Sequence, residues 1–185
     1  MDDVAYIAAI IDDVKLRYRL DEKRVFLVGH SNGGFLTHRI ACDLSERIAG
    51  IVSLAGAQWL DASRCKPTDK VAVLQVHGTA DTTIAYLGGH PMGNVMIPLH
   101  PGAQETVSDW GRFNGCAPDR VQAGTLDLDN TLFGEETLVT RHEGCAGGAA
   151  ELWSIVGGQH VPGLITGPGG FGEKIWGFLE AHPKP

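Results

Sequence analysis

The sequence predicts an α/β fold, in which helices cover both faces of a mostly parallel β-sheet. Two observations indicate this fold. Short, continuous apolar runs alternate with longer segments of helical periodicity, and a chain of 185 residues can bury one good core. We therefore expect a single domain over residues 1–185. The expected elements are helix 3–19, strand 25–29, helix 33–44, strand 48–55, strand 71–77, helix 103–114, strand 136–141, strand 151–156 and helix 171–181.

Helices and strands are distinguished here by the spacing of their apolar residues. The first helix has apolar residues at 3.6-residue spacing, and the aspartates at positions 2 and 3 suit a helix N-terminus. Strands are expected where the apolar run is continuous, as in residues 25–28, 71–76 and 151–156. The Gly- and Pro-rich residues 87–102 are expected to form one long loop, since strands resume after them.

Residues 25–34 carry the most informative motif, Val-Phe-Leu-Val-Gly-His-Ser-Asn-Gly-Gly. A Gly-x-Ser-x-Gly sequence between an apolar strand and a helical run is typical of a nucleophile elbow, which exposes the hydroxyl of Ser31 at a sharp turn. Gly29 and Gly33 are expected to be glycines because strand and helix come too close there for a Cβ. The alternative is a Gly-rich turn with an incidental serine.

A serine nucleophile needs a base and an acid that orients the base. In hydrolases with this elbow the chain order is serine, then Asp or Glu, then histidine. Asp81 follows strand 71–77 and His160 follows strand 151–156, so both are expected at the strand edge where α/β sheets bind ligands. The rival acids are Asp61, Asp69 and Asp109, each of which has an alternative as a solvated loop carboxylate or a helix cap.

The other seven histidines are expected to have different roles. His77 precedes Asp81 in one loop and is expected to be a structural hydrogen-bonding residue. His30 is next to Ser31 and is expected to point away from it, and His38 lies in the following helix. The remaining four lie in irregular or terminal segments: His90, His100, His142 and His182.

Charge and composition exclude several other functions. The chain has 22 acidic and 15 basic residues, a net charge of −7, and no basic cluster, so nucleic acid is not an expected partner. The longest nearly apolar stretch, residues 48–57, is far shorter than the roughly 20 residues that a membrane helix requires. No Cys/His cluster has zinc spacing, and we expect neither a metal nor an organic cofactor.

The four cysteines bear on the cellular compartment. A bridge between Cys116 and Cys145 would close a loop of about 30 residues and contribute about 3.5 kcal/mol when loop entropy is counted. Cys42 and Cys65 could form a second bridge, and the alternative is four buried thiols. The even count favours an extracellular or periplasmic location, although the sequence carries no export signal of its own.

Taken together, these motifs resemble the secreted α/β-hydrolases that include poly(3-hydroxybutyrate) depolymerases and feruloyl or acetylxylan esterases. The resemblance covers nearly the whole chain. Its further motifs are His-Gly-Thr-Ala-Asp at 77–81, Trp110, Asn-Gly-Cys at 114–116, Gly-Cys at 144–145 and Gly-Gly-Gln-His at 157–160. It implies a Ser31–Asp81–His160 triad in a three-layer sandwich, and a disulfide between the cysteines that match Cys116 and Cys145.

This resemblance has two departures. Val161 stands before Pro162-Gly163 where the family often has an aromatic residue, so one wall of the acyl pocket is expected to differ. Family members also have about a hundred further residues upstream, so we expect an N-terminally truncated fold that starts at the helix before the elbow. Asn32 N–H would supply one oxyanion donor, the second would be missing, and losing one donor typically costs about 10²–10³ in kcat.

The expected function is a serine carboxylic-ester hydrolase that acts through an acyl-enzyme. The resemblance implies polyhydroxyalkanoate, or hydroxycinnamoyl or acetyl polysaccharide esters, as substrates. His30 and Trp59 are candidate substrate-binding residues, and the alternative for Trp59 is the rim of the core. The alternative functions are a serine peptidase of the same fold and an inactive remnant. Residues 25–28 are expected to form an unprotected sheet edge through which the chain self-associates.

Overall fold

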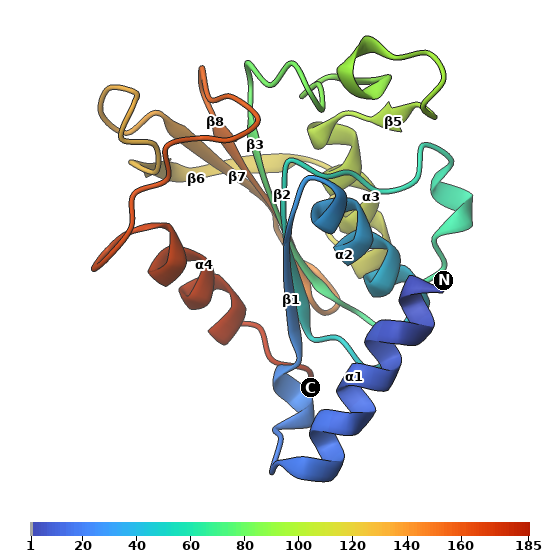
Figure 1. Ribbon diagram of the computed structural model, residues 1–185. Helices are drawn as coiled ribbons and strands as arrows, with labels where there is room; N and C mark the ends of the chain where they lie inside the picture. Colours follow the sequence, from blue (N-terminus) through green and yellow to red (C-terminus); the bar gives the residue numbers. More distant parts are fainter. Residues whose placement is uncertain (1) are drawn as a thin grey trace.

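In the computed structural model, which describes residues 2–185, a six-stranded sheet lies between two helical layers (Figure 1). The helices are α1 (Asp3–Arg17), α2 (Asn32–Asp43), α3 (Ala103–Asn114) and α4 (Phe171–Glu180). The strands lie in the order β1 (Phe26–His30), β2 (Gly50–Leu54), β3 (Ala72–Gly78), β8 (Ala149–Ile155), β7 (Thr137–His142) and β6 (Arg120–Leu126). Short 3₁₀ turns occur at η1 (Glu22–Arg24), η2 (Ala62–Arg64) and η3 (Pro91–Gly93).

The predicted fold class is confirmed: within this sheet β1, β2, β3 and β8 run parallel to one another, whereas β7 runs antiparallel to both β8 and β6. The sequence did not predict β6. Most of its residues are exposed, and Gly124 has a φ of 139° beside a shift in register. It therefore lacks the apolar run that marks a strand.

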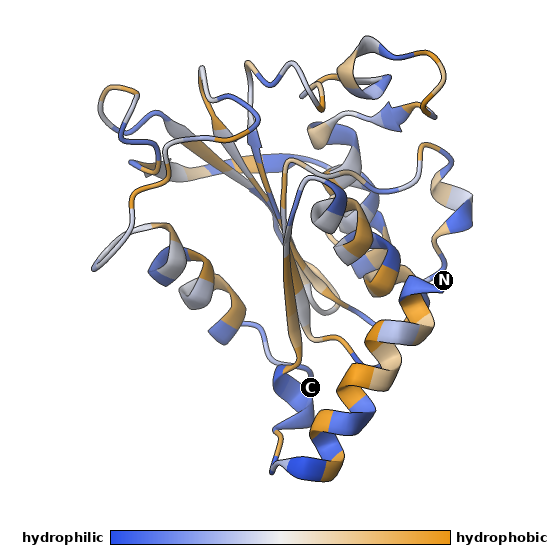
Figure 2. Ribbon diagram, viewed as in Figure 1, coloured by the Kyte–Doolittle hydropathy of each residue, from blue (hydrophilic) through white to orange (hydrophobic). Residues whose placement is uncertain are grey.

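Alternate residues of the central strands enter two separate cores. Ile51 and Val73 pack in the core beneath α1, α2 and α3. Their neighbours Val52 and Leu74 face the opposite way, into the core that α4 covers. Figure 2 shows these central strands as predominantly apolar. Both faces of the sheet are thus buried, which explains why most residues of β2 and β3 are apolar and do not alternate with polar ones.

The prediction of a single loop over residues 87–102 was incomplete. Its two ends pair as β4 (Gly88–Gly89) and β5 (His100–Pro101), which form a two-stranded antiparallel ribbon. Gly88 and Gly89 have φ values of 87° and 132°, which favour glycine. The ribbon therefore lacks the β-branched residues from which a strand is usually predicted. The segment between the two strands contains η3 and lies above the carboxyl ends of the central strands (Figure 1).

Both expected disulfides are present. Cys116–Cys145 joins the end of α3 to the turn before β8, and Cys42–Cys65 joins α2 to η2. The alternative of four buried thiols is wrong.

One edge of the sheet is formed by β1, as the sequence predicted. Val28, in the middle of this strand, is 55% exposed. Within residues 2–185, no helix combines the length and the apolar character that crossing a membrane requires.

Candidate active site

The backbone at Ser31 has the geometry of a nucleophile elbow. Ser31 joins β1 to α2 with a φ of 56° and a ψ of −120°, a conformation that non-glycine residues rarely adopt. Its N–H donates to the carbonyl of Leu54 at 2.8 Å, and its own carbonyl accepts from Phe35 N–H at 3.0 Å. The turn is thus fixed to β2 on one side and to the helix on the other.

The glycines around this turn do not all serve the purpose that the sequence suggested. A Cβ on Gly29 would lie 2.3 Å from the carbonyl oxygen of Gly33, so glycine is required at position 29. The prediction for Gly33 was wrong, since a Cβ there would meet nothing within 4 Å. Gly34 and Gly56 make the other close approach, because a Cβ on Gly56 would lie 2.4 Å from the carbonyl carbon of Gly34.

Asp81 and His160 lie beside this serine at the carboxyl ends of β3 and β8. His160 Nε2 is 2.9 Å from Ser31 Oγ, and His160 Nδ1 is 2.8 Å from Asp81 Oδ2. Because an ionised carboxylate only accepts hydrogen bonds, Nδ1 carries the proton and Nε2 is free to accept from the serine hydroxyl. The structure therefore brings together all three residues that the sequence selected.

The carboxylate of Asp81 is held in its charged form. Burial acts to raise its pKa, but hydrogen bonds from His77, His160 and the backbone N–H groups of Ile84 and Thr83 outweigh burial and hold the pKa well below its usual range. Both backbone bonds, to Oδ1, are 2.8 Å long. A fixed anion at this position stabilises an imidazolium at His160.

The loops that carry Asp81 and His160 are bound directly to each other. Ala80 N–H donates to the carbonyl of Gly158 at 3.0 Å, and Gly157 N–H donates to Thr79 Oγ1 at 2.9 Å. A Cβ on Gly78 would lie 2.2 Å from the carbonyl oxygen of Gly158. These contacts make Asp81 and His160 parts of one rigid unit.

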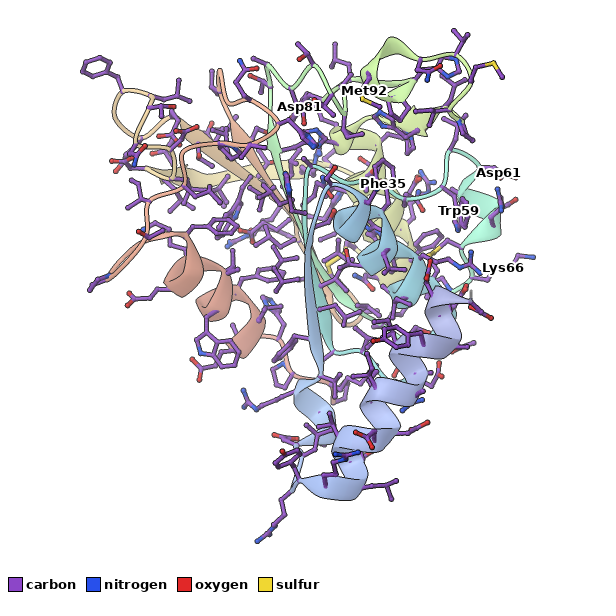
Figure 3. The ribbon with its side chains drawn as sticks, viewed as in Figure 1. Phe35, Trp59, Asp61, Lys66, Asp81 and Met92 are labelled. Carbon is purple, nitrogen blue, oxygen red and sulfur yellow. A yellow bond between two sulfur atoms is a disulfide. The ribbon has the colours of Figure 1, made fainter. Side chains whose placement is uncertain are left out.

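A cavity of about 910 Å³ opens beside Ser31. Most of its wall is apolar, with Phe35 from α2, Trp59 from the loop after β2, and Met92 from the segment between β4 and β5 (Figure 3). Asn32, the first residue of α2, also lines it. The sequence missed the contribution of residues 83–100, because an irregular segment shows no apolar periodicity from which a wall could be predicted.

The two candidate substrate-binding residues lie near the triad in different ways. The side chain of His30 contacts the loop of His160: its Nε2 lies 2.8 Å from the carbonyl oxygen of His160, and the centroids of the two rings are 4.8 Å apart. Trp59 lines the cavity, but the guanidinium of Arg64 lies 3.8 Å from its ring centroid. One face of the indole is therefore already covered by a cation.

The rival acids have other partners. Asp61 caps η2, Asp69 pairs with Lys184, and Asp109 bonds Arg112 and Gln58. His77 is a structural hydrogen-bonding residue, as predicted, with its Nε2 2.8 Å from the carbonyl of Ile84. The prediction that four further histidines lie in irregular or terminal segments was wrong for two of them, since His100 belongs to β5 and His142 to β7. All four bond a backbone carbonyl through Nδ1: His90, His100, His142 and His182.

Comparison with known protein families matches residues 1–108 to the phospholipase/carboxylesterase family. The chain belongs to this family. Similar curated proteins include feruloyl esterase B of Piromyces equi, 27% identical over all of this chain and 32% of its own length, and feruloyl esterase D of Neurospora crassa, 26% identical over 87% of this chain and 48% of its own length. The chain thus spans a third to a half of these relatives.

Solved structures agree on the fold. The acetyl xylan esterase from Aspergillus awamori superposes with a TM-score of 0.64 at 15% identity, over 96% of this chain and 66% of that one. A point variant of SOBER1 from Arabidopsis thaliana gives a TM-score of 0.56 at 17% identity, over 96% and 62% of the two chains. Family membership and the shared fold confirm the predicted α/β-hydrolase architecture.

Proposed function

We propose that this chain is a serine carboxylic-ester hydrolase in which Ser31 is the nucleophile, His160 the general base and Asp81 the orienting acid. One observation carries the proposal: the unbroken hydrogen-bond chain of 2.9 Å and 2.8 Å that joins these three side chains at an elbow open to a large cavity. Membership in the phospholipase/carboxylesterase family supports it.

The reaction follows from the positions of the protons. His160 Nε2 takes the proton of Ser31 as Oγ attacks the ester carbonyl, and Asp81 stabilises the imidazolium that forms. The same proton then passes to the leaving alcohol, and a water molecule, activated in turn by His160, releases the acid from the acyl-enzyme. Asn32 N–H, at the positive end of α2, would donate to the oxyanion.

The proposed substrates are hydroxycinnamoyl or acetyl esters of polysaccharides, with polyhydroxyalkanoates as the other ester class to be tested. The names of the relatives, feruloyl esterase and acetyl xylan esterase, support the first class. The cavity of about 910 Å³ is large enough for an aromatic acyl group, and its apolar wall suits one. Two disulfides support an extracellular location for such an enzyme.

The test compares the purified chain with Ser31→Ala and with Ser63→Ala, an exposed serine outside the triad. Turnover of p-nitrophenyl acetate and methyl ferulate, and labelling by a fluorophosphonate probe, should be present in the first and third proteins and absent from the second. Labelling without turnover would identify an inactive remnant with an intact nucleophile. Equal turnover by Ser31→Ala and the unmodified chain would refute the proposal, and cleavage of peptides rather than esters would favour a peptidase.

A further inference from the structure

Beyond the triad, a second chain of hydrogen bonds runs through the core. Trp110 Nε1 is 3.0 Å from His38 Nδ1, and His38 Nε2 is 3.0 Å from Gln75 Oε1. Gln75 Nε2 then lies 3.2 Å from His77 Nδ1. We call these four residues, Trp110, His38, Gln75 and His77, the buried relay; it starts on α3, crosses α2 and ends on β3.

The buried relay ends at the carboxylate of the proposed triad. His77 Nε2 is 2.8 Å from the carbonyl of Ile84 and 3.4 Å from Asp81 Oδ2. Asp81 Oδ2 also accepts the bond from His160. The ring N–H of His77 therefore donates to the carbonyl of Ile84 and also faces the Asp81 oxygen that accepts from His160.

All four residues of the relay are almost completely buried, with exposed fractions of 0% or 1%. Burying polar side chains is costly unless every group finds a partner. Gln75 meets this condition, since its amide also donates to the carbonyl of Gly56 at 2.8 Å. An apolar side chain would fill the same space in β3 without such requirements, so the presence of glutamine calls for a reason beyond packing.

The indole N–H of Trp110 determines the direction of every bond in the relay, because it can only donate. His38 Nδ1 must therefore accept, so the proton of His38 is on Nε2 and is donated to Gln75 Oε1. The amide nitrogen of Gln75 must then face His77, whose Nδ1 accepts. It follows that His77 carries its proton on Nε2, the atom that faces Ile84 and Asp81.

We propose that Trp110, His38 and Gln75 are positioning residues that fix the tautomer of His77, and that His77 in turn orients Asp81 toward His160. With the opposite tautomer, a lone pair of His77 would face both the carbonyl of Ile84 and the anionic Oδ2. The carboxylate would then lose a donor and turn from the geometry that bonds His160 Nδ1. The effect on catalysis rests on the proposed function, whereas the assignment of the His77 tautomer holds independently of it.

Gln75→Glu is the sharpest test, because it preserves shape and replaces the donating amide nitrogen with an accepting oxygen. This oxygen also faces the carbonyl of Gly56, so the buried acid stays protonated and donates its one proton there. Toward His77 the same oxygen can then only accept, which places the His77 proton on Nδ1. Nitrogen-15 NMR, which distinguishes a protonated from a bare ring nitrogen, should show the proton on Nε2 in the unmodified chain and on Nδ1 in the variant. Turnover of p-nitrophenyl acetate should fall about 10- to 100-fold in kcat, the range expected for losing a hydrogen bond to a charged group, with little change in KM.

The matched control is Ser45→Ala, which removes a buried hydroxyl whose hydrogen-bond partners are Thr68 and Asp69, all outside the relay. It should leave both the His77 tautomer and kcat unchanged. A folded Gln75→Glu protein that keeps the proton on His77 Nε2, or that moves the proton but keeps full turnover, would overturn the proposal. Should the unmodified chain hydrolyse no ester, the proposed function fails, and the NMR result alone then decides whether the relay sets the tautomer.

A second pair of variants keeps the test decisive if Gln75→Glu does not fold. His77→Gln places an amide N–H where His77 Nε2 lies and an amide oxygen toward the relay, whereas His77→Leu supplies no donor. The glutamine variant should retain kcat within about fivefold, and the leucine variant should lose about 10-fold or more. Equal losses in the two variants would show that His77 only fills space.

Discussion

Replacing His38 with glutamine should reduce the loss of stability that the protein suffers in mild acid. Burial lowers the pKa of His38 to about 4, and the hydrogen bond to Gln75 opposes this only in part. In the unfolded chain the pKa of His38 returns to its ordinary value of 6.5. Between these two values the unfolded state binds a proton that the native state excludes, so the free energy of unfolding falls as the pH falls from 6.5 toward 4.

The size of this effect follows from the two pKa values. At about 1.4 kcal/mol for each pKa unit, His38 removes about 3 kcal/mol of stability by about pH 4. Glutamine does not titrate, but it loses one of the two hydrogen bonds of His38, at a cost of about 1–2 kcal/mol at every pH. The unmodified protein should therefore be more stable at about pH 7.5 and the variant more stable at about pH 4.5, with the two curves crossing between about pH 6 and about pH 5.

Urea unfolding followed by tryptophan fluorescence at four pH values between about 7.5 and about 4.5 measures both curves. The difference at the highest pH, where histidine is neutral in both states, gives the cost of the lost hydrogen bond alone. The change in that difference with pH gives the contribution of His38. A difference that stays constant within about 0.5 kcal/mol across the range would refute the reasoning, because it would mean that His38 is not held neutral by burial.

Three further predictions concern other parts of the fold. Replacing Cys116 and Cys145 by serine opens a bridge with a sequence separation of 29 and should cost about 3.5 kcal/mol, seen by calorimetry as a Tm lower by about 7–14 °C; an unchanged Tm would contradict it. Gly29→Ala should lower both Tm and fluorophosphonate labelling, whereas Gly33→Ala should leave Tm unchanged or raise stability by up to about 1 kcal/mol; equal losses would contradict the steric argument. We also propose that the chain self-associates through β1, so Val28→Lys should shift the sedimentation profile toward the monomer, and identical profiles would exclude this edge as the interface.

The central part of the fold and the position of the triad could be predicted because both depend on local patterns. Asp81 and His160 each follow a buried strand, and parallel strands bring their carboxyl ends to one edge. The elbow was recognisable from Ser31 and its neighbours. The prediction for Gly33 is wrong, because the close approach of backbones that the motif suggests there is made by Gly34 and Gly56 instead.

The buried relay could not be found in this way, because its bonds join residues far apart in the sequence. In the sequence His38 is one histidine in a predicted helix, and its hydrogen-bond partners lie 37 and 72 positions away. The available signal was Gln75, the one polar residue in the run 71–76. β6 could not be predicted for a different reason. It pairs with β7 through backbone hydrogen bonds while most of its side chains are exposed, so its sequence shows no apolar periodicity.

Because the loops of Asp81 and His160 are bonded directly to each other, the proposed triad consists of two parts that can move independently: the Asp81–His160 pair and Ser31. Acid and base move together, since β3 and β8 are neighbours in the sheet and their loops are fastened to each other. Ser31, the proposed nucleophile, directly follows β1, which is an edge strand that pairs with β2. Fraying of that margin would lengthen the distance from Ser31 to His160 while leaving the acid–base pair intact. The reactivity of Ser31 should therefore report how well ordered the β1 edge of the sheet is. A strand that pairs with β1 would stabilise this edge and so change the reactivity of Ser31 without entering the cavity.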